Sequence, residues 1–140
     1  MADLTLRLTN DPDPEDLAQI GSQLAAFNDA DVGPAARQSL AVLVHEGDEL
    51  IAGLSGYTAW GWLYVQWLWI DQPQRGKGLA AQILAEAERE ARRRLCHGAY
   101  IDTFNPQALH VYQKAGYVPF GSLPDFPAGR TRTFLSKNLG

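Results

Sequence analysis

Apolar residues follow two different periods along the chain, and the changes between them predict a mixed α/β fold. Alternating apolar and polar positions are typical of half-buried strands, whereas apolar residues three or four positions apart are typical of helices. The expected strands cover residues 4–8, 41–46, 50–60, 62–70, 98–103, 117–123 and 132–135. The expected helices begin near residues 14, 80 and 106, with a loop at 28–34 and a further short segment before residue 40.

The middle of the chain predicts an antiparallel meander. Two apolar runs, 41–46 and 50–60, flank Gly47-Asp48-Glu49, which is typical of a hairpin with a short glycine-bearing loop. The run 62–70 follows almost at once, so it should pair with the second arm of the hairpin. An amphipathic helix comes next, and its apolar stripe comprises Ala80, Ile83, Leu84, Ala87, Ala91 and Leu95.

Composition narrows the class of protein. The 140 residues, 46% hydrophobic and 20% charged, predict a single globular domain covering residues 1–140. The formal net charge of −4 provides no broad cationic field, so nucleic acid is not an expected partner. One cysteine cannot form an internal disulfide, and the first residues do not resemble a secretion signal. The longest apolar run reaches about half the length that spans a bilayer, so we expect a cytoplasmic protein without a membrane partner.

A glycine-containing turn carries the first chemical signal. It reads Arg75-Gly76-Lys77-Gly78-Leu79-Ala80 and lies between an apolar strand and the amphipathic helix. The first turn of a helix offers unpaired N–H groups and the positive end of the dipole, and small residues let a pyrophosphate approach them. Such a turn can also simply join a strand to a helix. Neither the P-loop pattern nor the complete dinucleotide-binding glycine pattern is present.

Two motifs together resemble the GCN5-related N-acetyltransferase (GNAT) family. The pattern Arg75-x-x-Gly78-x-Ala80 is similar to the Gln/Arg-x-x-Gly-x-Gly/Ala signature of that family. Residues 105–117 resemble its later motif, in which an asparagine precedes a helix that carries a tyrosine, and Gly-Tyr opens a strand. The segment Asp102-Thr103-Phe104 further resembles a group of small bacterial members.

The resemblance implies an α/β (α+β) fold with a mixed, mostly antiparallel sheet of six to seven strands flanked by about four helices. Its two central parallel strands, here 63–70 and 99–103, would splay apart and hold the pantetheine arm of acetyl-CoA. By the same resemblance, the cofactor-binding residues are Leu68, Trp69 and Ile70 for that arm, Arg75, Gly76, Lys77, Gly78, Leu79 and Ala80 for the pyrophosphate, and Asn105 near the pantetheine. Acetyl-CoA is therefore the expected cosubstrate, and no metal is expected.

Tyr112 is the expected catalytic residue, because by the same resemblance its phenol lies near the thioester sulfur and can donate a proton to the leaving thiolate. The alternative is a buried tyrosine that only packs against the sheet. Asn105 precedes a proline and is also a good helix N-cap, so it could cap the helix, bind the ligand or do both. Some family members carry a basic glutamate on the strand before the phosphate turn, but the matching residue here is Tyr64, with Gln66 next on that face. The general base is therefore missing, and water ordered by Gln66 or binding of an already neutral amine are alternatives.

The histidines and tryptophans are expected to have structural roles. The three histidines and the single cysteine are not spaced like a zinc site, and His110 is expected to point to solvent. Trp60, Trp62, Trp67 and Trp69 crowd one hairpin, where core and sheet packing is the main interpretation. An aromatic wall for an apolar or cationic acceptor is the alternative.

Taken with the family resemblance, the motifs predict direct transfer of an acetyl group from acetyl-CoA to a primary amine of a small molecule, such as an amino acid, a polyamine-like compound or an antibiotic. A protein or peptide N-acetyltransferase is one alternative. A non-catalytic acyl-CoA-binding regulatory module is another, because the phosphate turn is present while the strand carboxylate is absent. Exposed edge strands would allow a homodimer.

Overall fold

The computed structural model of the chain describes residues 2–140, which fall into two compact units divided between Ala35 and Ala36. The first unit contains helix α1 (Pro14–Val32). Its N-terminus is capped by Asp13, whose side chain accepts a hydrogen bond from the backbone N–H of Glu15. The cap and the proline at the first helical position explain why the helix begins where the sequence predicts.

The first unit corrects two sequence predictions. Residues 4–8 form no strand, although apolar and polar residues alternate there. A strand needs a neighbour whose backbone groups pair with its own, and an alternating pattern does not supply that neighbour. Residues 28–32, expected to form a loop, continue α1. No glycine or proline interrupts them, and the helix ends before Gly33, which has a φ of 94°.

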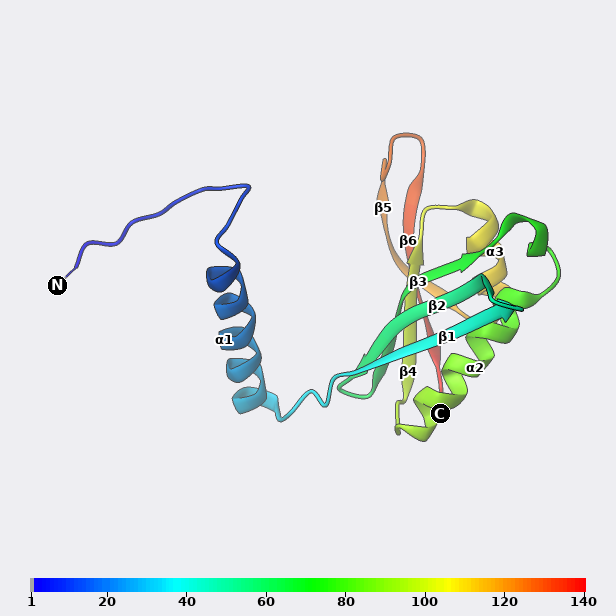
Figure 1. The fold of residues 1–140 in the computed structure, drawn as a ribbon, viewed down its shortest axis with the longest axis horizontal. Helices are drawn as coiled ribbons and strands as arrows, with labels where there is room; N and C mark the ends of the chain where they lie inside the picture. Colours follow the sequence, from blue (N-terminus) through cyan, green and yellow to red (C-terminus); the bar gives the residue numbers. More distant parts are fainter. Residues whose placement is uncertain (1) are drawn as a thin grey trace. The chain divides into compact units, whose positions relative to one another are not determined.

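The second unit is built on one sheet of six strands (Figure 1). The elements are β1 (Gln38–Glu46), β2 (Glu49–Ala59), β3 (Trp62–Ile70), the short 3₁₀ helix η1 (Gln72–Gln74), α2 (Leu79–Arg93), β4 (Gly98–Thr103), α3 (Pro106–Lys114), β5 (Val118–Pro124) and β6 (Thr131–Asn138). The strand order is β1-β2-β3-β4-β6-β5, in which β3 and β4 run parallel and the other neighbours run antiparallel. The predicted fold class, with its meander and its central parallel pair, is confirmed.

The hydrophobic core lies between the sheet and helix α2. The middle of the expected apolar stripe is buried: Ile83, Leu84 and Ala87 are at most 2% exposed and pack in one cluster with Leu63 and Val65 of β3. Leu95, expected to continue the stripe, is 87% exposed, because α2 ends at Arg93 and Leu95 has a positive φ of 65°. Full burial of a leucine or isoleucine side chain contributes about 1.5–3 kcal/mol to stability. We call the side of the sheet that contributes Leu63 and Val65 the helix-covered face.

One extra residue in β3 separates the two parallel strands. In the β2–β3 ladder Ser55 lies opposite Trp67 and Gly56 lies opposite Val65, so Gln66 is the additional residue of a β-bulge. The β3–β4 ladder ends at Val65. Because a bulge bends the strand that carries it, β3 departs from β4 beyond this point while it stays paired with β2. The expected splaying of the central strands thus has a local cause.

The bulge also changes which side chains of β3 face the core. Before it, Leu63 and Val65 are buried; after it, Leu68 packs against the core, whereas Trp67 and Trp69 are 68% and 47% exposed. An uninterrupted strand would have placed both tryptophans on the same side as Leu63 and Val65. Of the expected core and sheet packing, the core part is therefore wrong for these two tryptophans.

A buried carboxylate connects α2 to the C-terminal part of the sheet. The side chain of Glu88 is 4% exposed, and its Oε1 lies 2.7 Å from Nζ of Lys137. The hydroxyl of Tyr117 donates to Oε2 of Glu88 at 2.9 Å, and Lys137 also donates to the carbonyl of Ala115 at 2.8 Å. Both carboxylate oxygens are therefore bonded, as burial of a charge requires. Burial and the negative charge of Glu88 raise the pKa of Tyr117, which keeps its phenol a donor.

Candidate active site

A cavity of about 960 Å³ lies where β3 departs from β4. Its walls come from the end of β3, the turn that opens α2, the segment after β4 and one side of α3. All the site residues expected from the sequence line it except Lys77: they are Leu68, Trp69, Ile70, Arg75, Gly76, Gly78, Leu79, Ala80, Asn105 and Tyr112. The folded chain thus brings both sequence motifs to one cavity.

Helix α2 begins at this cavity without a side-chain cap. Helices α1 and α3 are capped by the side chains of Asp13 and Asn105, whereas the N-cap of α2 is Gly78 and makes no side-chain hydrogen bond. The first turn of α2 also contains no acidic residue. The N–H groups of this turn and the positive end of the helix dipole are therefore available to an anion in the cavity.

The two glycines of the turn are needed for its backbone conformation. Gly76 and Gly78 have φ angles of 77° and 78°, in the left-handed region that side chains with a Cβ rarely adopt. A Cβ at either position would meet no atom within 4 Å. A substitution at either glycine would therefore strain the backbone without causing a steric clash, and the space beside the turn is open to a ligand.

The two cations of the turn are placed differently. Nε of Arg75 donates to the carbonyl of Ile70 at 2.9 Å, so this side chain fixes the turn to the end of β3 and forms part of the cavity wall. Lys77 is not part of the wall. Lys114 on α3 does line the cavity and supplies a cation that the sequence reasoning missed.

The end of β3 offers one backbone edge to the cavity. Leu68, Trp69 and Ile70 pair with β2 on one side, while the ladder to β4 has already ended at Val65. Backbone groups on the open side can bind an extended, amide-bearing ligand in the way that an added strand binds a sheet edge. This is the arrangement expected from the sequence motifs.

Asn105 and Tyr112 approach the cavity from α3. The side-chain oxygen of Asn105 accepts hydrogen bonds from the N–H groups of Gln107 and Ala108, at 2.9 and 3.0 Å, so the capping role is real. The NH₂ group of the same side chain is then the part suited to a ligand. Tyr112 is 7% exposed, and burial, followed by the negative charge of Asp102, raises its pKa to about 12. The phenol is therefore neutral at physiological pH.

Several lining residues were not found by sequence reasoning. They are Gln74, Ala81, Thr103, Gln107, Ala108, His110, Val111, Lys114 and Ala115. His110, expected to point only to solvent, is exposed but borders the cavity. Ala108 and Ala115 lie four and three positions from Tyr112, so helical spacing from that tyrosine could have identified these two.

Within residues 2–140, no three side chains of His, Cys, Asp or Glu are grouped so that they could hold a metal ion. In the same part of the chain, no helix combines the length and the apolar character needed to cross a membrane.

The sequence matches one protein family and relatives named as acetyltransferases. Residues 5–117 match the model of the acetyltransferase (GNAT) family. Acetyltransferase Atu2258 of Agrobacterium fabrum is 42% identical over 133 residues, which cover 94% of this chain and 97% of the relative. Blasticidin-S acetyltransferase of Streptomyces morookaense is 42% identical over 95 residues, which cover 67% of this chain and 70% of the relative.

Solved structures share the fold. The crystal structure of a protein from Agrobacterium tumefaciens assigned as an acetyltransferase matches with a TM-score of 0.91 and 40% identity, covering 96% of this chain and 99% of that one. An aminoglycoside 6'-N-acetyltransferase complexed with coenzyme A has the same fold, with a TM-score of 0.65, 15% identity, and 94% and 95% of the two chains covered. From the matched family, the close relatives and the shared fold, it follows that this chain belongs to the acetyltransferase (GNAT) family and is an acyltransferase.

Proposed function

We propose that the protein transfers an acetyl group from acetyl-CoA to a primary amine of a small molecule. One observation carries this proposal: a single cavity is bordered by the uncapped start of α2, the open backbone edge of β3 and the phenol of Tyr112. These three features match the three parts of a thioester cosubstrate, which are a pyrophosphate, an amide-rich arm and a sulfur that must leave as a thiol.

The residues of the cavity fit the proposed donor. The N–H groups at the start of α2, with Arg75 beside them, suit a pyrophosphate. The open edge of Leu68, Trp69 and Ile70 suits the amides of pantetheine, and the NH₂ group of Asn105 suits one of its carbonyl oxygens. Lys77 lies outside the wall, so we expect it to contribute only a longer-range attraction that salt screens.

The proposed chemistry is direct attack. The amine nitrogen bonds to the thioester carbon, the C–S bond breaks, and its electron pair goes to sulfur. Tyr112 then donates its hydroxyl hydrogen to the developing thiolate. The pKa of Tyr112 is about 12 and that of an ordinary thiol is about 8.5, so early transfer of the whole proton to the thiolate is unfavourable. The main stabilisation of the thiolate is therefore a hydrogen bond from Tyr112 that strengthens as the C–S bond breaks.

A small acceptor is favoured over a protein acceptor by the relative named blasticidin-S acetyltransferase, which is 42% identical over two thirds of this chain. A protein or peptide acceptor is the alternative. We also propose that residues 1–140 form one acetyltransferase domain, because the family match at residues 5–117 extends across the boundary between the two compact units. Homodimer formation through an edge strand stays a prediction.

The test measures release of free thiol from acetyl-CoA in the presence of a panel of amines, with amino acids, polyamines, antibiotic amines and peptides in separate arms. Cys96, the free cysteine among residues 2–140, is buried and its thiol pKa is raised by burial, so it should react slowly with a chromogenic thiol reagent. Turnover with a small amine and not with peptides supports the proposal. Thiol release with peptides alone would favour the protein-directed alternative.

Two variants examine the assigned roles. Tyr112→Phe should lower kcat by about ten- to a hundredfold, the effect of one lost hydrogen bond to a charged group, with little change in CoA affinity. Arg75→Met should weaken CoA binding more than Lys77→Met does, because only Arg75 lines the cavity. Equal rates for the wild-type protein and Tyr112→Phe would remove Tyr112 from the mechanism.

A further inference from the structure

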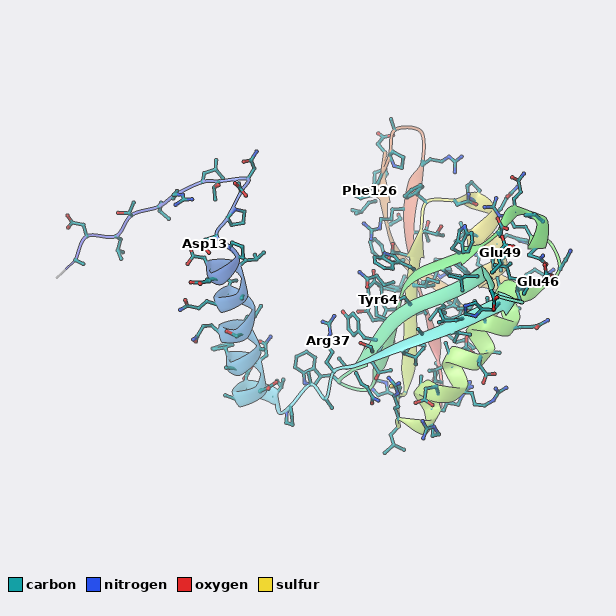
Figure 2. The ribbon with its side chains drawn as sticks, in the orientation of Figure 1. Asp13, Arg37, Glu46, Glu49, Tyr64 and Phe126 are labelled. Atoms are coloured by element: carbon teal, nitrogen blue, oxygen red, sulfur yellow. The ribbon has the colours of Figure 1, made fainter. Side chains whose placement is uncertain are left out.

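The side of the sheet opposite the helix-covered face carries three packed tyrosines and one carboxylate: Tyr57, Tyr64, Tyr100 and Asp102. We call this side the tyrosine face. The rings of Tyr64 and Tyr100 stack with their centroids 4.6 Å apart, and Tyr57 meets Tyr64 edge to face at 5.7 Å. In Figure 2, Tyr64 is labelled to the left of the sheet, together with Arg37 and Phe126, whereas α2 lies to the right. This group is not part of the cavity described above, and the function proposed so far does not use it.

Asp102 is held in one orientation within the tyrosine face. Its Oδ1 accepts a hydrogen bond from Nε of Arg132 at 2.9 Å and lies 2.8 Å from Nη2 of the same residue. Its Oδ2 accepts a hydrogen bond from the hydroxyl of Tyr64 at 3.2 Å. The side chain is 16% exposed. A carboxylate has about four lone-pair sites, so these contacts fix the group and leave it able to accept another hydrogen.

The position of Asp102 along β4 places it at the gap between the splayed strands. The β3–β4 ladder ends where Val65 pairs with Ile101, so Asp102 is the first residue of β4 beyond the last pair. The next residue, Thr103, lines the cavity on the helix-covered face. Successive strand residues point to opposite faces, so Asp102 borders the same gap from the other side. After burial, the negative charge of Asp102 also contributes to the raised pKa of Tyr112.

We propose that Asp102 is the proton acceptor for the incoming amine, a role that rests on the acetyl transfer proposed above. The amine enters the gap from the tyrosine face and donates an N–H hydrogen to Asp102. As the nitrogen bonds to the thioester carbon, this proton passes to the carboxylate, the C–S bond breaks, and sulfur takes a proton from Tyr112. Asp102 then gives up its proton to water, and Tyr112 regains one from water, so that one proton moves in sum from the amine to the thiol.

Tyr64 occupies the strand position at which a basic residue was expected, and it contacts the carboxylate of Asp102. Its strand position matches that of a basic glutamate in some GNAT proteins, and its hydroxyl reaches the carboxylate of Asp102 on the neighbouring strand. Two other carboxylates of the second unit have hydrogen-bond partners of their own. Both oxygens of Glu88 are bonded in the core, and Asp71 accepts from the N–H of Gln72 at the start of η1. The rival proton acceptor is His110, which borders the cavity from α3.

The test compares steady-state kinetics and CoA binding for the full chain. Asp102→Asn keeps an oxygen that can accept from Arg132 but removes the basic carboxylate. It should lower kcat by about a hundredfold or more, in the range of general base catalysis, with less than about a threefold change in the KM of the amine. CoA affinity, followed by tryptophan fluorescence to which Trp69 in the cavity wall contributes, should not change. Asp48→Asn, a matched loss of charge in the exposed β1–β2 turn, should behave as the wild-type protein.

A second variant separates basicity from structure. Asp102→Ala leaves Arg132 and Tyr64 in place to hold a small carboxylate, so added sodium formate should raise its kcat at least about tenfold, whereas sodium chloride at the same ionic strength should not. Wild-type kcat in Asp102→Asn, a change confined to KM, or a loss of kcat seen in His110→Gln and not in Asp102→Asn would overturn the assignment. If the wild-type protein acetylates no amine, the proposed function fails and this inference fails with it, whereas turnover that survives loss of Asp102 refutes only this inference.

Discussion

Replacing Glu88 alone with leucine should destabilise the protein strongly, because it breaks a buried ion pair and a buried hydrogen bond. The substitution leaves the hydroxyl of Tyr117, a residue 1% exposed, without its acceptor and leaves Lys137 without its partner charge. Removing one partner of a buried pair destabilises by about 3–5 kcal/mol. Because the side chain of Lys137 is 24% exposed and keeps its bond to the carbonyl of Ala115, the lower end, about 3 kcal/mol, is expected.

The double variant Glu88→Leu/Lys137→Met removes both charges and retains apolar volume. It should be less destabilised than the sum of the single variants by at least about 1 kcal/mol, which is the coupling expected for contacting residues. Tyr117→Phe, which removes one hydrogen bond to a charged group, should lower stability by about 1.5 kcal/mol. Urea unfolding followed by circular dichroism gives these free energies from the midpoint and the slope. A change below about 1 kcal/mol in Glu88→Leu, or strictly additive effects, would refute the reasoning.

Three further predictions concern the strands and the cavity. Gly56→Ala should destabilise by at least about 2 kcal/mol, because the new Cβ would lie 1.9 Å from the backbone oxygen of Tyr64; Gly121→Ala, with no atom within 4 Å, is the strand control, and urea unfolding compares them. Asn105→Ala should lower stability by about 1 kcal/mol, because it removes the helix cap. Asn105→Asp should keep the cap but weaken CoA binding measured by calorimetry. Equal CoA binding by Asn105→Asp and the wild-type protein would show that the side-chain NH₂ group does not bind the ligand. Tyr112 has an ordinary pKa of 10.0 in the unfolded chain and about 12 when folded, so its contribution to stability is complete below pH 10 and is lost as pH rises from 10 through 12. Tyr112→Phe should reduce this alkaline loss of stability by up to about 2–3 kcal/mol, measured by denaturation at stepped pH. An unchanged loss would contradict the raised pKa of Tyr112.

The strands were largely predictable from local patterns, and the residues that line the cavity were largely predictable from the family resemblance of two motifs. The period-2 runs gave the β1–β2 hairpin and the bounds of β3, and the segment from Arg75 to Ala80 pointed to the start of α2 at which the cavity lies. The strand expected at residues 4–8 failed because strand formation depends on a partner far away in the sequence. The core packing expected for Trp67 and Trp69 failed, because the face on which they lie depends on a register shift in the β2–β3 ladder.

The proposed role of Asp102 was not predictable from the sequence, for a different physical reason. The family resemblance points to the strand position that Tyr64 occupies, and the phenol of Tyr64 is not basic at neutral pH. The carboxylate on the neighbouring strand became a candidate only when the parallel pairing of β3 and β4 brought Tyr64 OH within 3.2 Å of it. Contacts between strands that are distant in sequence are set by register, which no single segment encodes.

The single additional residue in β3 has a consequence for anyone who transplants or redesigns this site. Deleting Gln66 would not merely narrow the gap, because every side chain from residue 67 to residue 70 would exchange sides, sending Trp67 inward and Leu68 outward. Gly56 would have to change too, since its missing side chain admits the detour of the backbone at Tyr64. The gap between β3 and β4 therefore depends on β2 and β3 together, and a graft of this site should carry both of these strands intact rather than copy individual contact residues.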